Sequence, residues 1–410
     1  LYSVNGYLFE IPAAWADQWQ ARSSGISARA SHTMVWTGTD MIVWGGGGEG
    51  TFLRNGGRYN LATDTWQPTS LSNAPSGRWF HAAVWTGTEM IVWGGRANFN
   101  WSDHVNTGGR YDPATDRWRP ISTNGAPAPR SQFAAVWTGS EMLVWGGMAD
   151  NYGHYNDGAR YNPATDTWSP MATSNAPTAR FEPTGIWTGT EMIVWGGVRY
   201  DAQTRLWTSF NTGGRYNPTT DTWTPTTLLN APEPRTHHTA VWTGTAMLVW
   251  GGRELPADQY LKTGGRYDPQ TDTWSPLASE TAPTPRAYHA AVWTGSEMLI
   301  WGGCNPFHSV FLNTGARYDV GTDTWTAMTQ SNAPIARYLW RPDAGIWTGE
   351  GMLVFGGSRY TEMIASNDYY VPGEPARTYD LSADYSLAAN PHGPWSYGSL
   401  EVFDGPFSLL

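Results

Sequence analysis

The sequence predicts an all-β fold, a seven-bladed β-propeller in which seven four-stranded units surround a central axis. Three observations lead to this prediction: a segment that recurs seven times, a repeat length near fifty residues, and a pattern of strands and turns that fills each repeat. A repeat of this length is typical of one four-stranded propeller blade. The repeats extend over about residues 17–385, which we predict to be the propeller domain.

The recurring segment reads Trp-Thr-Gly-Thr-Glu-Met-Ile-Val-Trp-Gly-Gly at residues 85–95. Its first Trp always precedes the second aromatic residue by 8 positions, and the Tyr of the Arg-Tyr pair precedes the next Trp by 7 positions in six copies. The copies of the second aromatic residue are spaced by 49, 52, 50, 55, 51 and 54 residues, at Trp44, Trp93, Trp145, Trp195, Trp250, Trp301 and Phe355. Most length variation therefore lies between Gly-Gly and Arg-Tyr.

Each repeat is predicted to hold four short strands, named a to d. In the second repeat, residues 82–85 form strand a, a turn at 86–88 contains a Gly that can take positive φ, and residues 90–93 form strand b. A variable loop leads to strand c at 109–111. The turn at 112–116 is rich in turn-forming residues, and Trp118 begins strand d.

The seventh repeat lacks a complete fourth strand. It supplies strands at 345–347 and 352–355 and a third at 378–379, but no Trp follows at the expected distance. Asp17-Gln18-Trp19 copies the Asp-Thr-Trp of strand d, so we predict that this N-terminal segment completes the last blade and leaves no unpaired edge there. Closure by Tyr385 is the alternative.

Four apolar residues, a Gly-Gly pair, a Tyr and a Trp at fixed distance and a following Arg resemble the kelch repeat, whose fold is a β-propeller. The chain is similar to bacterial extracellular kelch-type proteins and, more distantly, to propellers of the galactose oxidase type. Residues 1–16 are expected to be a lead-in. Residues 386–410, with Trp395, are expected to form a short C-terminal β extension or the start of a truncated β-sandwich module of the kind found in secreted bacterial multidomain proteins.

Composition excludes several classes of function. The 410 residues carry a formal charge of −10, and 24 of the 25 basic residues are Arg, so the broad basic surface that binds nucleic acid is not expected. A single Cys allows neither an internal disulfide nor a multi-Cys metal site, and no apolar run is long enough to enter a membrane. The chain begins at Leu1 with no leader, which we interpret as a removed signal peptide or a piece of a longer, secreted chain or assembly.

The b–c and d–a loops share one face, which carries the variation in length and residue type, whereas the a–b and c–d turns repeat in every blade. Binding residues are usually found on such variable loops. Aromatic side chains on this face offer large contact area for a glycan or a protein partner, although each could also pack neighbouring loops together. The predicted ligand-binding residues are Trp79, Trp101, Phe181, Trp207, His237, Tyr288, Tyr338 and Trp340.

One Arg stands at the head of strand a in every blade. Such a ring could bind carboxylates, but a residue repeated in each blade favours a scaffold role in which it holds the d–a loop. Three of these Arg residues are included in the predicted ligand-binding set: Arg78, Arg235 and Arg286. Three positions after the head Arg, four blades carry His: His32, His81, His238 and His289.

No metal site or cofactor is predicted. The pair Tyr288-His289 resembles part of the copper site of galactose oxidase, which would make His238, His289 and Cys304 the candidate ligands, but no segment matches the Cys motif of that family. Acidic loop residues without a ligand pattern leave calcium as a second alternative. No phosphate-binding or hydrolase motif occurs. We therefore predict a secreted, non-enzymatic binding or scaffold propeller, with a copper-radical oxidase or a sugar-converting propeller enzyme as the alternative.

Overall fold

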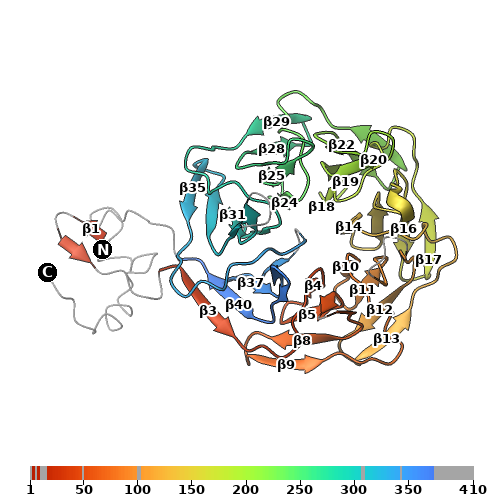
Figure 1. The fold of residues 1–410 in the computed structure, drawn as a ribbon, viewed down its shortest axis with the longest axis horizontal. Coiled ribbons are helices and arrows are strands. Elements are labelled where there is room, and N and C mark those ends of the chain that lie inside the picture. The colour runs from red at the N-terminus through yellow and green to blue at the C-terminus, as the bar shows by residue number, and fades with distance from the viewer. Residues whose placement is uncertain are drawn as a thin grey trace, which may run out of the picture. The chain divides into compact units, whose positions relative to one another are not determined.

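The computed structural model describes residues 2–4, 7–9, 16–48, 50–98, 103–305, 310–341 and 344–373. It divides the chain into two compact units, residues 19–369 and residues 1–18 with 370–410. The larger unit consists of seven four-stranded antiparallel sheets around an axis, so the predicted all-β, seven-bladed propeller is confirmed (Figure 1). Its innermost strands, the strands a, contact one another around the axis.

The blades follow one another along the chain. Blade 1 comprises β4 (Thr33–Trp36), β5 (Asp40–Trp44), β8 (Gly56–Asn60) and β9 (Thr65–Pro68). Blade 2 comprises β10 (Ala82–Trp85), β11 (Met90–Trp93), β12 (Gly108–Asp112) and β13 (Arg117–Pro120). Blade 3 comprises β14 (Ala134–Trp137), β15 (Met142–Trp145), β16 (Gly158–Asn162) and β17 (Thr167–Pro170). Blade 4 comprises β18 (Thr184–Trp187), β19 (Met192–Trp195), β22 (Gly213–Asn217) and β23 (Thr222–Pro225).

The remaining blades repeat this order until the last strand. Blade 5 comprises β24 (Thr239–Trp242), β25 (Met247–Trp250), β28 (Gly264–Asp268) and β29 (Thr273–Pro276). Blade 6 comprises β30 (Ala290–Trp293), β31 (Glu297–Trp301), β34 (Gly315–Asp319) and β35 (Thr324–Ala327). Blade 7 comprises β36 (Gly345–Trp347), β37 (Met352–Phe355), β40 (Asn367–Val371) and, as its fourth strand, β3 (Gln18–Arg22).

The blades are held together by aromatic contacts that recur around the ring. The Trp that ends strand b is fully buried and meets the strand d Trp of the next blade, as Trp44 meets Trp118 with ring centroids 5.3 Å apart. Trp301 of blade 6 meets Trp19 of β3 at 5.1 Å, and Phe355 of blade 7 meets Trp66 of blade 1 at 5.2 Å. Closure of the ring by the N-terminal strand is therefore confirmed by both sheet order and side-chain packing.

The third strand of blade 7 differs from the prediction. It is β40 (Asn367–Val371), and Tyr370 occupies the place expected for Tyr379. The loop between strands b and c is therefore shorter than the position of Tyr379 suggested. Tyr379, Tyr385 and the predicted segment 386–410 lie outside the described residues. In the predicted lead-in, β1 (Tyr2–Val4) and β2 (Tyr7–Phe9) pair antiparallel.

The Gly-Gly pair after strand b has a steric cause. Gly45 and Gly46 have φ of 69° and 94°, a region that favours glycine. A Cβ on Gly45 would lie 2.7 Å from the His81 ring of the next blade, and one on Gly46 would lie 2.7 Å from the carbonyl oxygen of Ala30. The pair thus lets strand b pass close to two d–a loops.

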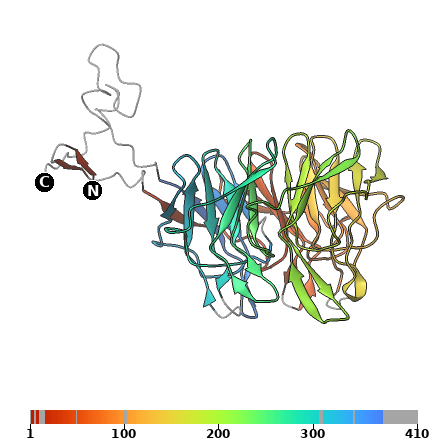
Figure 2. The ribbon, with the colours of Figure 1, turned by 90° about the horizontal axis from the view of Figure 1, so that it is seen from above.

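The b–c connections form small hairpins on the side that faces the viewer in Figure 1, which is the lower side of the propeller in Figure 2. They are β6 (Gly47–Gly48) with β7 (Thr51–Phe52), β20 (Val198–Asp201) with β21 (Leu206–Ser209), β26 (Arg253–Glu254) with β27 (Gln259–Tyr260), β32 (Cys304–Asn305) with β33 (Val310–Phe311), and β38 (Ser358–Arg359) with β39 (Glu362–Met363). The short 3-10 helix η2 (Asp150–Tyr152) belongs to the blade 3 connection. This side is the variable face.

Candidate functional site

The d–a loops of successive blades meet around the axis and are joined by backbone hydrogen bonds. The N–H of Gln132 donates to the carbonyl of Phe80 (3.2 Å), that of Glu182 to Gln132 (2.7 Å), and that of Tyr288 to His237 (3.1 Å). In blades 1 to 6 these residues lie two positions after the head Arg. Together with Trp340 of blade 7 they are called the mouth ring: Ser31, Phe80, Gln132, Glu182, His237, Tyr288 and Trp340.

Every member of the mouth ring has a left-handed backbone conformation, with φ between 53° and 59°, although none is glycine. This conformation disfavours residues that carry a Cβ and is found where the surrounding structure imposes it, often at ligand sites. The repeated backbone therefore presents seven different side chains around the axis. The predicted binding residues His237, Tyr288 and Trp340 belong to this ring.

Blade 7 contributes a longer loop to the mouth. The head Arg precedes the strand a Trp by 7 residues in six blades, but Arg337 precedes Trp347 by 10. Leu339 makes the backbone hydrogen bond to Tyr288 (2.9 Å), so the extra residues follow it. The indole of Trp340 donates to Ser358 Oγ (2.8 Å), and the guanidinium of Arg341 donates to the carbonyl of His81 in blade 2.

One side of the mouth ring is polar and is built around Glu182. Its carboxylate accepts hydrogen bonds from Gln132 Nε2 (2.5 Å) and from the Thr236 hydroxyl (2.8 Å), and it lies 2.8 Å from His237 Nδ1. Burial raises the pKa of Glu182, but attraction to His237 and the hydrogen bonds from His237 and Thr236 outweigh it, so the pKa lies below its ordinary value. Burial lowers the pKa of His237 despite the carboxylate. The pair is therefore an ionised carboxylate with a neutral imidazole at neutral pH.

The other side of the mouth ring is aromatic. The imidazole of His237 stacks on Tyr288 with centroids 3.9 Å apart. Trp340 packs edge to face with Tyr288 at 5.9 Å and with Phe80 at 6.0 Å. Burial raises the pKa of Tyr288 well above its ordinary value, so its hydroxyl stays neutral. A polar arc formed by blades 3 to 5 therefore adjoins an aromatic arc formed by blades 6, 7 and 2.

The other predicted aromatic residues lie outside the mouth ring, on the rim. Phe181 and Trp207 pack with centroids 5.8 Å apart, and Trp207 continues to Tyr200 at 4.9 Å. Tyr152 lies against Tyr200 at 5.2 Å and is 38% exposed. This places Phe181 inside a loop-packing cluster and leaves Tyr152 partly exposed at its end.

A second rim cluster joins blades 6 and 7. Tyr338 is buried and stacks on Phe311 at 5.5 Å, and Phe311 meets Tyr360 at 4.7 Å. Tyr360 is 63% exposed.

In blade 2, Trp79 packs against Phe52 at 5.4 Å. Trp101 lies outside the described residues.

The head Arg residues are scaffold residues, and the predicted ligand contacts of Arg78, Arg235 and Arg286 are corrected by the structure. All three side chains are buried. The guanidinium of Arg286 donates to the carbonyls of Thr284, Gly302 and Thr314 and to two threonine hydroxyls, at 2.7–3.2 Å. Arg78 and Arg235 make the corresponding sets of five hydrogen bonds. All five N–H groups are thus used within the protein, and none remains for a ligand.

The four repeated histidines pack between blades. His289 Nε2 lies 2.8 Å from the Thr239 hydroxyl of blade 5, and its ring meets the edge of Trp250 at 5.2 Å. His238 repeats this arrangement with Thr184 (3.1 Å) and Trp195. Cys304 is buried beside Tyr260 and Tyr288, and burial raises the pKa of its thiol to about 12. Within the described residues, no three His, Cys, Asp or Glu side chains come together as metal ligands. These residues do not fit the copper site that the resemblance to galactose oxidase implies.

Comparison with known proteins agrees with this geometry. A family model described as Attractin/LZTR1 beta-propeller matches residues 53–307, and one described as Kelch motif matches residues 285–331. The chain belongs to the kelch-repeat β-propellers.

Among curated relatives of this kelch propeller, Kelch domain-containing protein 3 of Bos taurus is 29% identical over 189 residues, which are 42% of this chain and 48% of the relative. Kelch-like protein 25 of Xenopus tropicalis is 27% identical over 42% of this chain and 27% of its own length. Rab9 effector protein with kelch motifs of Bos taurus is 38% identical over 21% of this chain and 24% of its own length. The matches thus span about half the length of these relatives or less.

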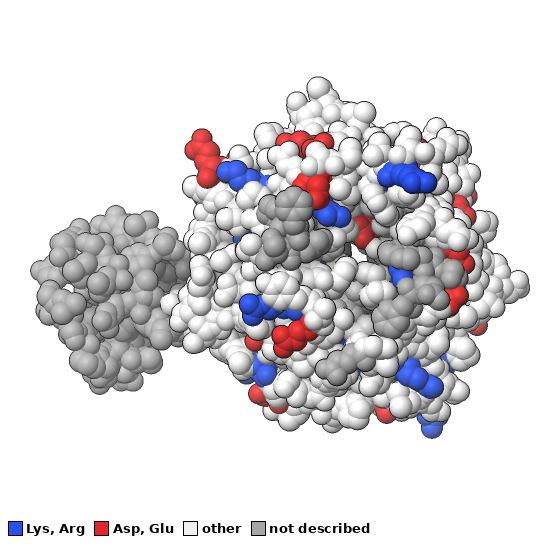
Figure 3. Space-filling model, viewed as in Figure 1, with Lys and Arg blue, Asp and Glu red and all other residues white. Residues whose placement is uncertain are grey.

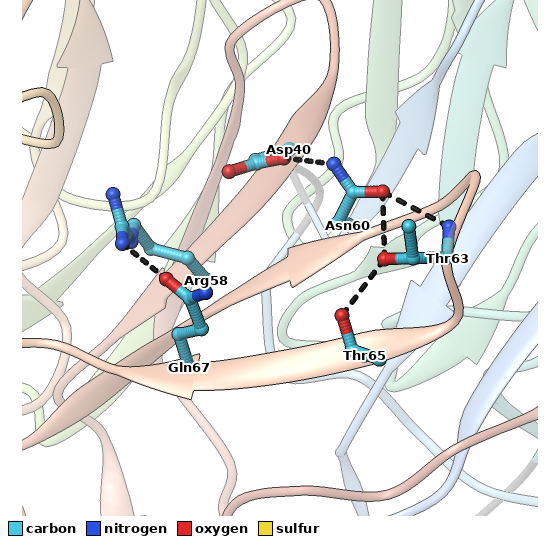
Figure 4. Close-up of a pocket in the computed structure, with 6 residues that line it drawn as sticks. All are labelled: Asp40, Arg58, Asn60, Thr63, Thr65 and Gln67. Carbon is cyan, nitrogen blue, oxygen red and sulfur yellow. Dashed lines mark hydrogen bonds between the residues drawn. The ribbon is translucent and has the colours of Figure 1, made fainter.

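A surface hollow of about 450 Å³ lies in blade 1 of the kelch propeller, away from the variable face. It is lined by Asp40, Arg58, Asn60, Thr63, Thr65 and Gln67 (Figure 4). In blades 2 to 4 and 6 a Glu stands where blade 1 has Asp40 and pairs with the strand c Arg, as Glu297 pairs with Arg317 at 3.1 Å. The shorter Asp40 instead accepts from Asn60 (2.8 Å), while Arg58 donates to the carbonyl of Pro113 and to Gln67. The hollow is therefore a local variation of a repeated structural contact.

Charge is thinly distributed over the variable face of the kelch propeller. Figure 3 shows scattered basic and acidic side chains on this face, without a broad patch of either sign.

Within the described residues, no helix is long and apolar enough to cross a membrane.

Four mouth-ring residues were not among the predicted binding residues: Ser31, Phe80, Gln132 and Glu182. Two signals could have found them. The residue two positions after the head Arg differs in every blade, whereas most of the repeat is constant. The 10-residue distance from Arg337 to Trp347 marks the longer loop of blade 7.

Proposed function

We propose that this chain is a non-enzymatic binding scaffold whose variable face docks a protein partner. The observation that carries the proposal is the exposure of single aromatic side chains at the ends of packed clusters on that face, Tyr152 and Tyr360. Tyr152 packs on Tyr200 and Tyr360 packs on Phe311, so little side-chain entropy is lost on binding. Membership of the kelch-repeat β-propellers supports a protein-binding role in general.

Glycan binding on the same face is the second candidate. Exposed Tyr rings can stack on sugar rings, and Tyr360 lies beside Arg359, whose guanidinium is 5.9 Å from the ring centroid. A glycan ligand would use the same residues as a protein partner. The two candidates therefore differ in the ligand and not in the position of the site.

The test uses one set of variants against both ligand classes. Partners are identified by affinity capture and then purified, and their Kd is measured by calorimetry, while a glycan array is probed in parallel. Tyr152→Ala and Tyr360→Ala are expected to raise the Kd at least about tenfold, as truncated aromatic anchors do. Thr63→Ala, on the repeated face, is the control and should leave the Kd unchanged. An equal loss with the control variant would place binding on the other face and overturn the proposal.

A further inference from the structure

We propose that the polar arc of the mouth ring, formed by Gln132, Glu182 and His237, is a binding site for a basic side chain, arginine or lysine, presented by the protein partner. This inference rests on the proposed protein-binding function and names the group that would enter the central channel. It follows from the orientation of three neighbouring side chains, the aromatic wall beside them and the positions of the resident charges.

The carboxylate of Glu182 is held in place before any ligand arrives. Gln132 Nε2, the Thr236 hydroxyl and His237 Nδ1 all contact its two oxygens at 2.5–2.8 Å. These contacts come from blade 3 on one side and from blade 5 on the other. A carboxylate fixed in this way loses little conformational freedom when it pairs with a cation.

The acceptors of this arc outnumber its remaining donors. His237 donates through Nδ1, so the Nε2 of the neutral imidazole carries a lone pair. Gln132 donates through Nε2, and its Oε1 is buried without a hydrogen-bond partner among the described residues. Each carboxylate oxygen of Glu182 can accept more than one hydrogen bond. A guanidinium or ammonium group carries only donors and is the complementary chemistry.

The neighbouring aromatic arc suits the rest of a basic side chain. Tyr288 lies beneath the His237 ring, and Trp340 meets Tyr288 at 5.9 Å. Aromatic rings at such a site contact the apolar stem of Arg or Lys and attract its charge. Acceptors on one side and aromatic rings on the other discriminate a basic side chain from a purely apolar one.

Two resident cations lie near the mouth, and neither pairs with Glu182. Arg253 pairs with Asp258 at 3.1 Å, and its charge also helps to keep the pKa of Glu182 low. Arg341 donates to the carbonyl of His81, and its charge contributes to the low pKa of His32 and His81 in blades 1 and 2. The positive charge of Arg341 therefore lies toward blades 1 and 2, on the side of the mouth away from Glu182.

The experiment uses a blocked amino acid, Nα-acetylarginine methylamide, with Nα-acetylcitrulline methylamide as the uncharged probe of similar shape. Binding to the whole chain is followed by ligand-observed NMR titration. We expect the arginine probe to bind at least about tenfold more tightly than the citrulline probe, because charge-assisted hydrogen bonds are the stronger ones. Equal binding of the two probes, or no binding of the arginine probe, would overturn the inference without any variant.

Variants then locate the site. Glu182→Gln keeps the shape of the side chain and is expected to reduce arginine binding at least about tenfold, to the level of citrulline. Glu191→Gln is the matched control, because it makes the same charge change in the same blade where Glu191 pairs with Arg215 (3.7 Å) on the repeated face. Equal loss in both variants would assign the effect to net charge and contradict the site. Failure of the docking proposal is seen separately, since Tyr152→Ala and Tyr360→Ala act on the protein partner and not on the arginine probe.

Discussion

Tyr370 donates a hydrogen bond of 2.5 Å to the carboxylate of Asp17, which stands 353 residues earlier in the chain. In the other six blades, the strand c Tyr donates to an Asp five residues later at 2.6–2.7 Å. The same pair thus occurs in all seven blades, but only in blade 7 does it join the two ends of the propeller. The N–H of Gly373 also donates to Asp17, at 2.8 Å.

Tyr370→Phe should weaken ring closure. The substitution keeps the ring but removes the donor to a carboxylate, which lowers the free energy of unfolding by about 1.5–3 kcal/mol. Loosening of β3 should also increase proteolytic cleavage near residues 17–22. Urea denaturation and limited proteolysis are the measurements. Tyr161→Phe removes the same bond within one hairpin and should lower stability without exposing β3, so equal cleavage of the two variants would contradict the closure role.

Arg286→Met should destabilise the fold and leave ligand binding unaffected in the fraction that folds. The carbonyls of Gly302 and Thr314 would lose their buried donors, and each unsatisfied group costs about 1–3 kcal/mol. Thermal unfolding checks this. Arg286→Lys should fail to rescue, because an ammonium cannot reproduce the planar set of five donors. Arg54, an exposed Arg, is the control, and its change to Met should shift stability by no more than about 0.5 kcal/mol.

The buried histidines predict a loss of stability in mild acid. Burial, with nearby Arg charges, holds the pKa of His32, His81, His238 and His289 well below the ordinary 6.5. The unfolded chain therefore binds the additional protons, and the stabilisation is present above pH 6.5 and lost as the pH falls below it. Each group contributes a slope of up to about 1.4 kcal/mol per pH unit, so all four together contribute up to about 5.5 kcal/mol per pH unit. Urea denaturation between pH 7.5 and 5.5 measures the slope.

A natural substitution supplies the control for this pH dependence. Blade 3 has Phe133 where blades 1, 2, 5 and 6 have His, and its ring meets Trp93 at 5.2 Å, the distance between His289 and Trp250. His289→Phe should therefore fold and reduce the slope by about 1.4 kcal/mol per pH unit. A slope that stays the same in this variant would mean that other groups cause the acid sensitivity.

Arg341→Ala should remove the contact between the blade 7 loop and blade 2 at the mouth ring. It removes a donor to the carbonyl of His81, and stability should fall by about 1–2 kcal/mol. The charge of Arg341 also helps to lower the pKa of His81, so that pKa should rise toward its ordinary value. NMR titration of the imidazole measures the change. Arg359→Ala, on the rim, should leave the pKa of His81 unchanged.

The fold could be predicted because each repeat combines strand-forming and turn-forming segments with Trp, Tyr and Arg residues at fixed distances. Trp19 was identified as a fourth strand from its Asp-Gln-Trp context, and its contact with Trp301 confirms this. The third strand of blade 7 was placed wrongly because Asn367–Val371 lacks Gly-Arg-Tyr. The strand is marked by other residues: Ser366 and Asp368 accept hydrogen bonds from the head Arg337.

The candidate site could be predicted less well, for a physical reason. The variable face and the aromatic positions follow from loop length and residue type. The cluster of Gln132, Glu182 and His237 is formed by residues about fifty positions apart that meet only when the ring closes. Whether an Arg faces solvent or five internal acceptors is also decided by tertiary packing, which is why Arg78, Arg235 and Arg286 were included in the binding set.

In the mouth ring, the backbone conformation is the same at every position, whereas the side chain differs from blade to blade. Seven side chains stand on one repeated loop conformation, and their neighbours in each loop are held by the head Arg and the Gly-Gly pair. A single substitution in the ring can therefore exchange one contact while the loop keeps its course. Ligand preference in such a molecule can change through successive point mutations at seven positions, without insertions and without a new fold.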